Sequence, residues 1–246
     1  MLMRSQIEAM RAVTFTAAAQ VDMSHHGSDE EVRAAAEGRL SLLTPVVKGW
    51  CTEKSEEITS LGIQIHGGMG YVEETGAAQH YRDARILAIY EGTNGIQAAD
   101  LAGRKILGDE GREIRKLISE LREVCAGMQG DEALATIADS VSAGLDQLEQ
   151  GVDWLLANAM SHPAALGASS FNLLMLTGTV LGAAYLAKGA AAASAAGGTD
   201  PGFLKEKVAT TAFYCAHVLP RAQGYLAAMR ADPEVTMALP AEAFLD

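Results

Sequence analysis

The sequence predicts an all-α protein built from two helical segments in series, and three observations support this fold class. Hydrophobic residues make up 49% of the 246 residues but aromatic residues only 5%, so Ala, Leu, Val and Met can fill a core. Apolar residues recur every three or four positions over long stretches, as in amphipathic helices. No stretch alternates apolar and polar residues as a strand would. We therefore predict a first helical domain over residues 1–108 and a second over 112–246.

The first helix is predicted over residues 1–22, because the apolar residues Leu2, Met3, Ile7, Met10, Val13 and Phe15 share one face. The histidine pair His25–His26 follows, and we place it in a solvent-facing loop. Either Ser28 or Asp29 can cap a second helix, which we expect over residues 30–62.

Glycine-rich segments divide the remainder of the first half. Residues 67–70 contain three glycines, too many for a continuous helix. A short helix is predicted over residues 76–86. A turn over 90–93 then precedes a helix that ends near residue 107, and the glycine- and acid-rich segment over 108–112 marks the predicted domain boundary.

In the second half, four helices are predicted, over residues 112–126, 131–159, 168–194 and 202–230. The segments that separate them are Gly130–Asp131, His162–Pro163 and the low-complexity run Ala190–Gly198. The uncharged stretch over 154–187 divides into two shorter apolar pieces. The second piece is 17 residues long, whereas a bilayer needs roughly 20 predominantly apolar residues. We expect a buried core helix there and no membrane span.

Charge and cysteine usage exclude several function classes. Acidic residues outnumber basic ones by 31 to 19, which gives a net charge of -12 and argues against nucleic acid as a partner. Cys51, Cys125 and Cys215 are widely spaced, so they predict neither a disulfide framework nor a metal site. They are interpreted as buried small hydrophobic residues in a reducing compartment, which favours a cytoplasmic location.

Two segments make little sense as plain helix connections. Within residues 64–71, three glycines each destabilise a helix by roughly 1 kcal/mol relative to Ala. Glycines at such a position are useful where the backbone must approach a phosphate closely. The alternative is a flexible helix end.

Within residues 90–97, Thr93 is placed to cap a helix, and Glu91 follows the apolar run 86–89, so Glu91 can line an apolar pocket as a general base. The alternative is an exposed glutamate in a turn.

Taken together, the two segments are more specific, because the sequence over residues 63–107 reads IQIHGGMGYVEETGAAQHYRDARILAIYEGTNGIQAADLAGRKIL. This stretch resembles the C-terminal domain of FAD-dependent acyl-CoA dehydrogenases, in which a glycine loop, an Arg-Asp-Ala-Arg helix and a Tyr-Glu-Gly-Thr turn follow in this order. The resemblance extends more loosely over residues 1–108. Residues from 112 onward resemble the extra helical module of a subgroup of long acyl-CoA dehydrogenases that includes the 3-methylmercaptopropionyl-CoA type.

The resemblance implies a set of site residues. Glu91 matches the catalytic base that removes the α-proton of an acyl-CoA thioester, and its own backbone N–H is one donor to the thioester carbonyl. Gly92 adjoins the thioester, and Arg104 lies near the CoA nucleotide. The FAD contacts of the same subunit are expected from Thr93, Asn94 and Gly95.

The glycine loop is implied to complete the FAD site of a neighbouring subunit, through Gln64, Ile65, His66, Gly67 and Gly68. This predicts at least a dimer, or a homotetramer. Arg82, Asp83 and Arg85 are interpreted as an ion-paired helix face that holds the two loops in register. An electron-transferring flavoprotein is the expected electron acceptor.

Relative to the family, residue 1 falls inside the second helix of the C-terminal domain. The first helix of that domain and the two preceding domains have no counterpart in the sequence, so we expect a fragment, a truncated product, or one subunit of a split enzyme completed by a partner chain. Two functions remain open: the C-terminal portion of an acyl-CoA dehydrogenase that oxidises an acyl-CoA to the trans-2-enoyl-CoA, or a catalytically inactive, oligomerising helical module.

Overall fold

The computed structural model describes residues 1–162, 164–195 and 200–244, and every regular element within them is helical. The first half contains α1 (Leu2–His26), α2 (Glu30–His66), α3 (Gly68–Tyr71), η1 (Glu73–Thr75), α4 (Ala77–Leu87), α5 (Asn94–Ala99) and the π-helix η2 (Asp100–Leu107). The second half contains α6 (Arg112–Gly127), α7 (Glu132–Asn158), α8 (Ala165–Ala195), α9 (Pro201–His217), α10 (Arg221–Met229), η3 (Pro233–Met237) and η4 (Ala241–Phe244). The predicted all-α fold is confirmed.

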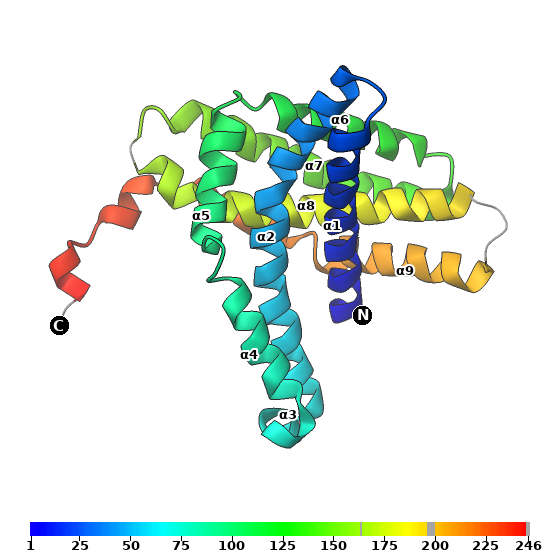
Figure 1. Ribbon diagram of the computed structural model, residues 1–246, viewed down its shortest axis with the longest axis horizontal. Coiled ribbons are helices and arrows are strands. Elements are labelled where there is room, and N and C mark those ends of the chain that lie inside the picture. Colours follow the sequence, from blue (N-terminus) through cyan, green and yellow to red (C-terminus); the bar gives the residue numbers. More distant parts are fainter. Residues whose placement is uncertain (163, 196–199, 245–246) are drawn as a thin grey trace.

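The helices form a bundle from which one arm projects (Figure 1). The long helix α8 runs through the bundle and packs against α1, α2, α5, α7, α9 and α10. Helix α2 crosses this layer and continues beyond it, where α4 packs along its C-terminal half and α3 closes the end. We call residues 52–87 the arm and residues 64–71 its tip.

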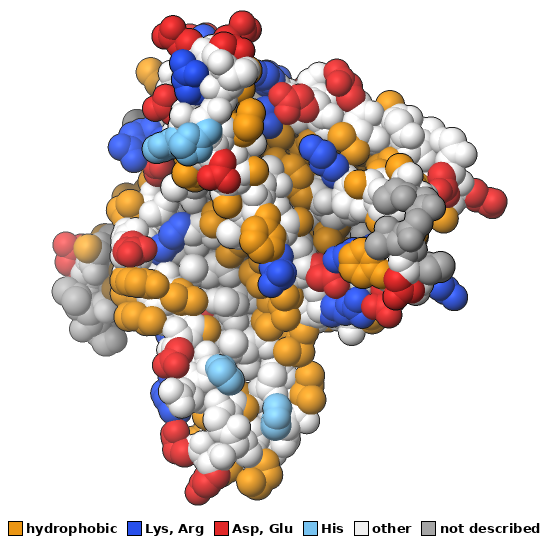
Figure 2. Space-filling view, turned by 45° about the vertical axis from the view of Figure 1, so that its right-hand side comes forward, with side chains coloured by type: hydrophobic (Ala, Val, Ile, Leu, Met, Phe, Trp, Pro, Cys, Tyr) orange, Lys and Arg blue, Asp and Glu red, His pale blue; other side chains and the backbone are white. Residues whose placement is uncertain are grey.

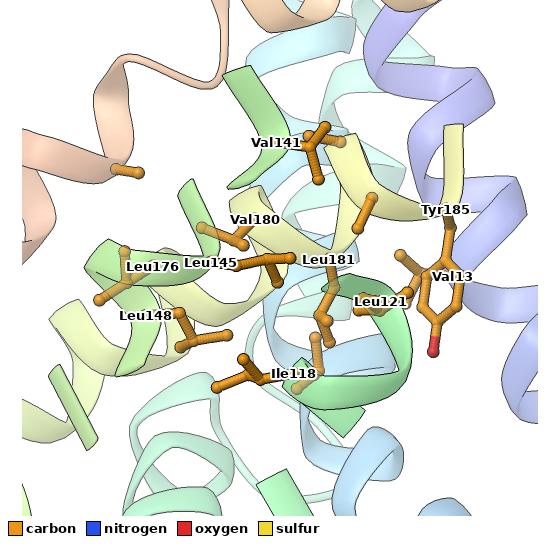
Figure 3. Close-up of a cluster of buried hydrophobic side chains, with 14 of the residues drawn as sticks. Val13, Ile118, Leu121, Val141, Leu145, Leu148, Leu176, Val180, Leu181 and Tyr185 are labelled. Atoms are coloured by element: carbon orange, nitrogen blue, oxygen red, sulfur yellow. The ribbon is translucent and has the colours of Figure 1, made fainter. Parts of the chain in front are cut away.

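Both halves of the chain contribute to one hydrophobic core. In Figure 3, side chains from α1, α6, α7 and α8 converge, among them Val13, Leu121, Leu145 and Leu181. All four are buried, with at most 3% of their surface exposed. The second half therefore acts as a support on which α1 and α2 pack.

The two halves pack tightly together between α2 and α8. Trp50 is fully buried, and a Cβ atom built on Gly178 would lie 2.1 Å from its Cγ. A Cβ built on Gly182, one turn further along α8, would lie 3.1 Å from another carbon of the same indole. Glycine at these positions lets the large ring lie directly on the backbone of α8.

The expectation of a buried core helix is confirmed for α8. The helix is long and apolar enough to cross a membrane by length and composition, but 89% of its most hydrophobic window is buried inside the bundle. Its surface is thus covered by protein on nearly every side, including the Trp50 contact described above.

Several helix boundaries differ from the predicted ones. Helix α1 continues through His25 and His26, which are exposed in its last turn and not in a loop. Asp29 is the N-cap of α2 and accepts a hydrogen bond from the Val32 N–H at 2.9 Å. Helix α2 extends beyond the predicted residue 62 and ends at His66, because Gly67 has a left-handed φ of 61°, and the chain becomes helical again over Gly68–Tyr71.

The single helix predicted over residues 202–230 is wrong. Helix α9 ends at His217 and α10 begins at Arg221, with Pro220 at the junction. Proline has no N–H and its ring clashes with the preceding turn, so the chain changes direction although the apolar spacing continues. Of the predicted separators, Pro163 and residues 196–198 lie outside the described residues.

The three cysteines are free thiols. Cys125 and Cys215 are buried as expected, whereas Cys51 is only partly buried. Burial of the thiols raises the pKa of Cys51 to about 11 and that of Cys215 to about 12. Within the described ranges, no group of His, Cys, Asp and Glu side chains is arranged to hold a metal ion.

Candidate functional site

A tight turn between α4 and α5 carries the predicted base. Glu91 and Gly92 adopt consecutive left-handed conformations, with φ of 54° and 81°. The N–H of Asn94 donates to the carbonyl oxygen of Ala88 at 3.1 Å, which closes the turn, and the Gln97 side-chain amide donates to the Glu91 carbonyl oxygen at 3.3 Å. A non-glycine residue in this region is uncommon and strained, so the turn is held by its surroundings.

Thr93 caps α5, as predicted from the sequence. Its hydroxyl accepts a hydrogen bond from the Ile96 N–H at 3.3 Å. Glycine is favoured at position 92, immediately before Thr93, for two reasons. Its φ is positive, and an added Cβ would lie only 3.1 Å from the side-chain amide nitrogen of Gln97. Gly92 and the Thr93 cap are therefore the local contributions to this turn.

The expectation that Glu91 lines an apolar pocket is wrong for this chain, because Glu91 is exposed. Apolar side chains do surround it, but they are exposed as well: Ile89 is 49% exposed, Tyr90 47% and Ile96 61%. These side chains form an open apolar surface beside the carboxylate and do not close over it.

The backbone around Glu91 offers hydrogen-bond donors. Within the described part of the chain, the N–H groups of Glu91, Gly92 and Thr93 donate to no backbone or side-chain acceptor. Three successive amides without an acceptor, beside an exposed carboxylate, can bind an oxygen atom of a ligand such as a carbonyl.

Asn94 has a different role from the expected one. Its side chain is buried, and its amide Nδ2 donates to the Thr52 hydroxyl and to Glu53 Oε1, both at 2.8 Å. Its Oδ1 accepts a hydrogen bond from Lys48 Nζ at 2.9 Å. The side chain thus fastens α5 to α2, and only the backbone of Asn94 is left to contact a cofactor.

The residues that hold Asn94 were not identified from the sequence. Lys48, Thr52 and Glu53 lie 41 to 46 positions before Asn94, so no local motif links them to it. The one available signal was the position of Lys48 in an otherwise apolar segment of α2, between Pro45 and Trp50. A lysine there needs a polar partner within the fold.

The glycine loop lies at the tip of the arm, and its residues are exposed as far as Met69. Gly67 needs its positive φ, and a Cβ on Gly70 would lie 2.3 Å from the Ile63 carbonyl oxygen. Gly68 differs from both: it has no positive φ, and an added Cβ would meet nothing within 4 Å. The fold of this chain therefore does not explain why residue 68 lacks a side chain.

The two loops lie at opposite ends of the arm. The turn of Glu91 is fastened to α2 at Thr52, and Gly67, the first glycine of the tip, lies 15 residues later, which corresponds to about 22 Å along a helix. They do not meet in one pocket of this chain.

Ion pairs connect the elements of the arm. Arg82 of α4 pairs with Glu73 of η1 at 2.7 Å, and Arg85 pairs with Glu56 of α2 at 3.2 Å. Asp83, the third residue of the predicted ion-paired face, forms no salt bridge with the described residues, and such exposed pairs contribute little stability each. Arg104 lies on η2, is largely exposed and pairs with Asp100.

The surface of the arm carries exposed apolar side chains among charged ones, and it is hollowed near the tip. Hydrophobic side chains are exposed along the arm and at its end (Figure 2), including Ile65 at 74% and Tyr71 at 82%. His66 lines a cleft of about 290 Å³, together with Met3, Ile58 and His80. Such exposed apolar surface on a projecting element is typical of an interaction site.

In a comparison with known proteins, each half of the chain matches a protein-family model. Residues 1–106 match the family model "Acyl-CoA dehydrogenase, C-terminal domain", and residues 114–240 match "Acetyl-CoA dehydrogenase C-terminal like". The chain is 44% identical over 221 residues to the 3-methylmercaptopropionyl-CoA dehydrogenase of Ruegeria pomeroyi, covering 88% of this chain and 37% of that protein.

Two solved structures share the fold. The Caenorhabditis elegans ACDH-11 in complex with C11-CoA matches with a TM-score of 0.72 at 22% identity, over 86% of this chain and 34% of that one. The acyl-CoA dehydrogenase of Bacillus anthracis complexed with FAD matches with a TM-score of 0.63 at 24% identity, over 92% of this chain and 41% of that one. The chain spans well under half the length of each of these relatives.

Proposed function

The chain belongs to the acyl-CoA dehydrogenase family, and we propose that it supplies the helical C-terminal part of an FAD-dependent enzyme that oxidises an acyl-CoA to the trans-2-enoyl-CoA. The observation that carries this proposal is the turn over residues 90–95. An exposed carboxylate, three amide N–H groups without acceptors, and exposed apolar side chains occur together there.

In the proposed reaction, the Glu91 carboxylate removes the α-proton of the bound thioester. This proton is a weak acid, so negative charge that develops on the thioester oxygen has to be stabilised as the proton leaves. The free N–H of Glu91 supplies one donor for that oxygen. Gly92 leaves room beside the thioester because it carries no side chain. FAD, when bound, supplies the acceptor for the hydride that leaves the β-carbon as the double bond forms.

Residues on both ends of the arm fit a role in holding FAD. Thr93 and Gly95 are exposed beside Glu91, and the backbone of Asn94 lies between them. We assign the residues of the tip, Gln64, Ile65, His66, Gly67 and Gly68, to the FAD of a neighbouring subunit. Two facts support this assignment: the separation of about 22 Å along α2, and the open space beside Gly68. We therefore propose a dimer or a higher oligomer.

Other parts of the proposal follow from the family. Arg104 is exposed on η2 and is proposed to lie near the CoA nucleotide. Electron-transferring flavoprotein is proposed as the acceptor of the electrons. The relative from Ruegeria pomeroyi makes a short thioether-containing acyl-CoA a candidate substrate. Three free cysteines suit a reducing compartment, for which we propose the cytoplasm.

Flavin retention tests this proposal. The purified chain is mixed with FAD, alone and together with candidate partner chains that carry a flavin-covering domain, and is then desalted before its absorbance spectrum is recorded. We expect a flavin spectrum in at least one mixture. Gly68→Ala should weaken FAD binding by about tenfold or more, because a methyl group would displace the closest backbone contact.

The matched control is Gly127→Ala, at the exposed end of α6, where an added Cβ also meets nothing within 4 Å. It should leave flavin binding unchanged. Protein that stays colourless in every mixture would overturn the proposal and leave the oligomerising helical module as the function. Equal flavin binding in the two alanine variants would remove the tip from the site.

A further inference from the structure

We propose that a cleft between α1, α2, α6 and α8 binds a small monocarboxylate with a short alkyl chain, such as hexanoate. The ligand's carboxylate replaces that of Glu120 on Arg39 and accepts a hydrogen bond from Tyr185. The cleft has a volume of about 360 Å³, at the lower end of the range for small-molecule sites. Arg39 lies 13 residues before Thr52 on α2, about 20 Å along the helix, so the cleft is separate from the turn of Glu91. The inference does not depend on the proposed dehydrogenation.

The first observation is a buried hydroxyl group without a partner. Tyr185 lines the cleft from α8 and is only 7% exposed. Its ring extends away from α8, with the hydroxyl at the outer end (Figure 3). Among the described residues this hydroxyl has no hydrogen-bond partner, although most buried polar side-chain atoms in proteins have one. Burial raises the pKa of Tyr185 to about 12, so the hydroxyl keeps its proton and can donate a hydrogen bond to a ligand.

The second observation is that the cleft already holds a carboxylate. Arg39 Nη1 and Nη2 donate to the two carboxylate oxygens of Glu120, at 2.9 and 3.0 Å, and Arg39 Nε donates to Glu113 at 2.6 Å. The contact with Glu120 is bidentate, the geometry in which a guanidinium group matches a carboxylate. The Glu120 side chain is 47% exposed and that of Glu113 only 19%, so Glu120 is the partner that an arriving carboxylate can replace.

The third observation is the positive charge of the cleft. Lys116 on α6 and Lys188 on α8 line it, and neither forms an ion pair within the described ranges. Together with Arg39 they outnumber the two carboxylates that Arg39 binds, although the whole chain has a net charge of -12. The Arg39 guanidinium holds the pKa of Glu120 below its usual range against the effect of burial, and both lysines add to this lowering. A ligand with a single negative charge therefore balances the cleft.

The remaining walls favour an alkyl chain. Val32 of α2 and Leu117, Leu121 and Val124 of α6 line the cleft with aliphatic side chains. Val32 and Val124 are half-buried, so an alkyl chain would cover apolar surface that now reaches water. Inorganic phosphate could meet the cations but would leave this surface uncovered. The cleft thus suits a carboxylate that carries an apolar chain.

The ligand class is tested on the chain itself, without flavin. Hexanoate is titrated into the protein at constant ionic strength, and binding is followed by calorimetry and by NMR. We expect saturable binding with a Kd of about 1 mM. Hexanamide has the same shape without the charge, and inorganic phosphate lacks the alkyl chain, so each should bind about tenfold or more weakly. No saturable binding of hexanoate, or equal binding of either comparison compound, would overturn the inference.

Exchange with Glu120 predicts a gain of affinity on substitution. In Glu120→Gln no carboxylate of the chain competes for this side of Arg39, so the Kd of hexanoate should fall by about tenfold. Glu123→Gln is the matched control, because Glu123 is also exposed on α6 but does not line the cleft. Hexanoate affinity that is no higher in Glu120→Gln than in Glu123→Gln would contradict the exchange.

The hydroxyl of Tyr185 is tested by two measurements on one variant. Tyr185→Phe removes the donor and should weaken hexanoate binding by about tenfold, whereas Tyr225→Phe on α10, outside the cleft, should not. Without ligand, the urea midpoint of Tyr185→Phe should stay the same or rise, because the hydroxyl has no partner to lose. Equal hexanoate binding in the two variants, or a lower midpoint in Tyr185→Phe, would contradict the inference.

Discussion

Replacement of Glu91 by Gln is expected to lower dehydrogenation by about 10²- to 10⁴-fold or more in the flavin-bearing enzyme, while FAD stays bound. Glutamine has the same shape as glutamate and keeps the amide N–H groups of the turn in place, but it cannot accept the α-proton. The measurement is steady-state turnover of a short-chain acyl-CoA with a dye as electron acceptor. The flavin absorbance of the same samples reports FAD content.

The control for this substitution is Glu110→Gln. Glu110 shares the exposed position and the left-handed backbone of Glu91, but it lies in the connection between the two halves of the chain. The Glu110→Gln enzyme should oxidise the acyl-CoA at the wild-type rate. Turnover of Glu91→Gln within a factor of about two of Glu110→Gln would remove Glu91 from the proposed role.

The second large effect is expected on stability. Gly178→Leu should lower the free energy of unfolding by about 3 kcal/mol or more, because the added side chain has no room beside Trp50. Since Trp50 is fully buried between α2 and α8, the ring cannot move aside without separating the two helices. Urea unfolding followed by circular dichroism measures the change.

The matched control is Gly189→Leu on the same helix, where an added Cβ would meet nothing within 4 Å. Its midpoint should stay close to that of the wild type. If the two variants unfold at the same urea concentration, α8 does not pack on α2 as described. The second half would then not support α2, which ends at the tip and to which the turn of Glu91 is fastened through Asn94.

Much of the fold could be predicted because its determinants are local. Apolar spacing predicts the helices, Asp29 and Thr93 are caps within three residues of the N–H groups that they bind, and Gly67 interrupts α2 through its own φ. The break between α9 and α10 was missed because the apolar periodicity continues through it, although Pro220 lies there. In this case the missing N–H of proline outweighs the periodic pattern.

The site was less predictable, because its determinants are distant in sequence. The sequence predicts Glu91 as the base, but it does not show whether other side chains close over its carboxylate, and in this chain they do not. Asn94 was expected to contact a cofactor, yet its side chain is committed to Lys48, Thr52 and Glu53 on α2. Such a network becomes visible only once α5 is packed on α2.

The removal of the α-proton itself is the most direct test of the account. The flavin-bearing enzyme is mixed in D₂O with an acyl-CoA analogue whose β-carbon is replaced by sulfur, so that an α-proton can leave but no β-hydride can follow. Exchange of the α-hydrogen for deuterium is measured by mass spectrometry. We predict rapid exchange in the wild type and in Glu110→Gln, and almost none in Glu91→Gln. Equal exchange in all three proteins would contradict the account.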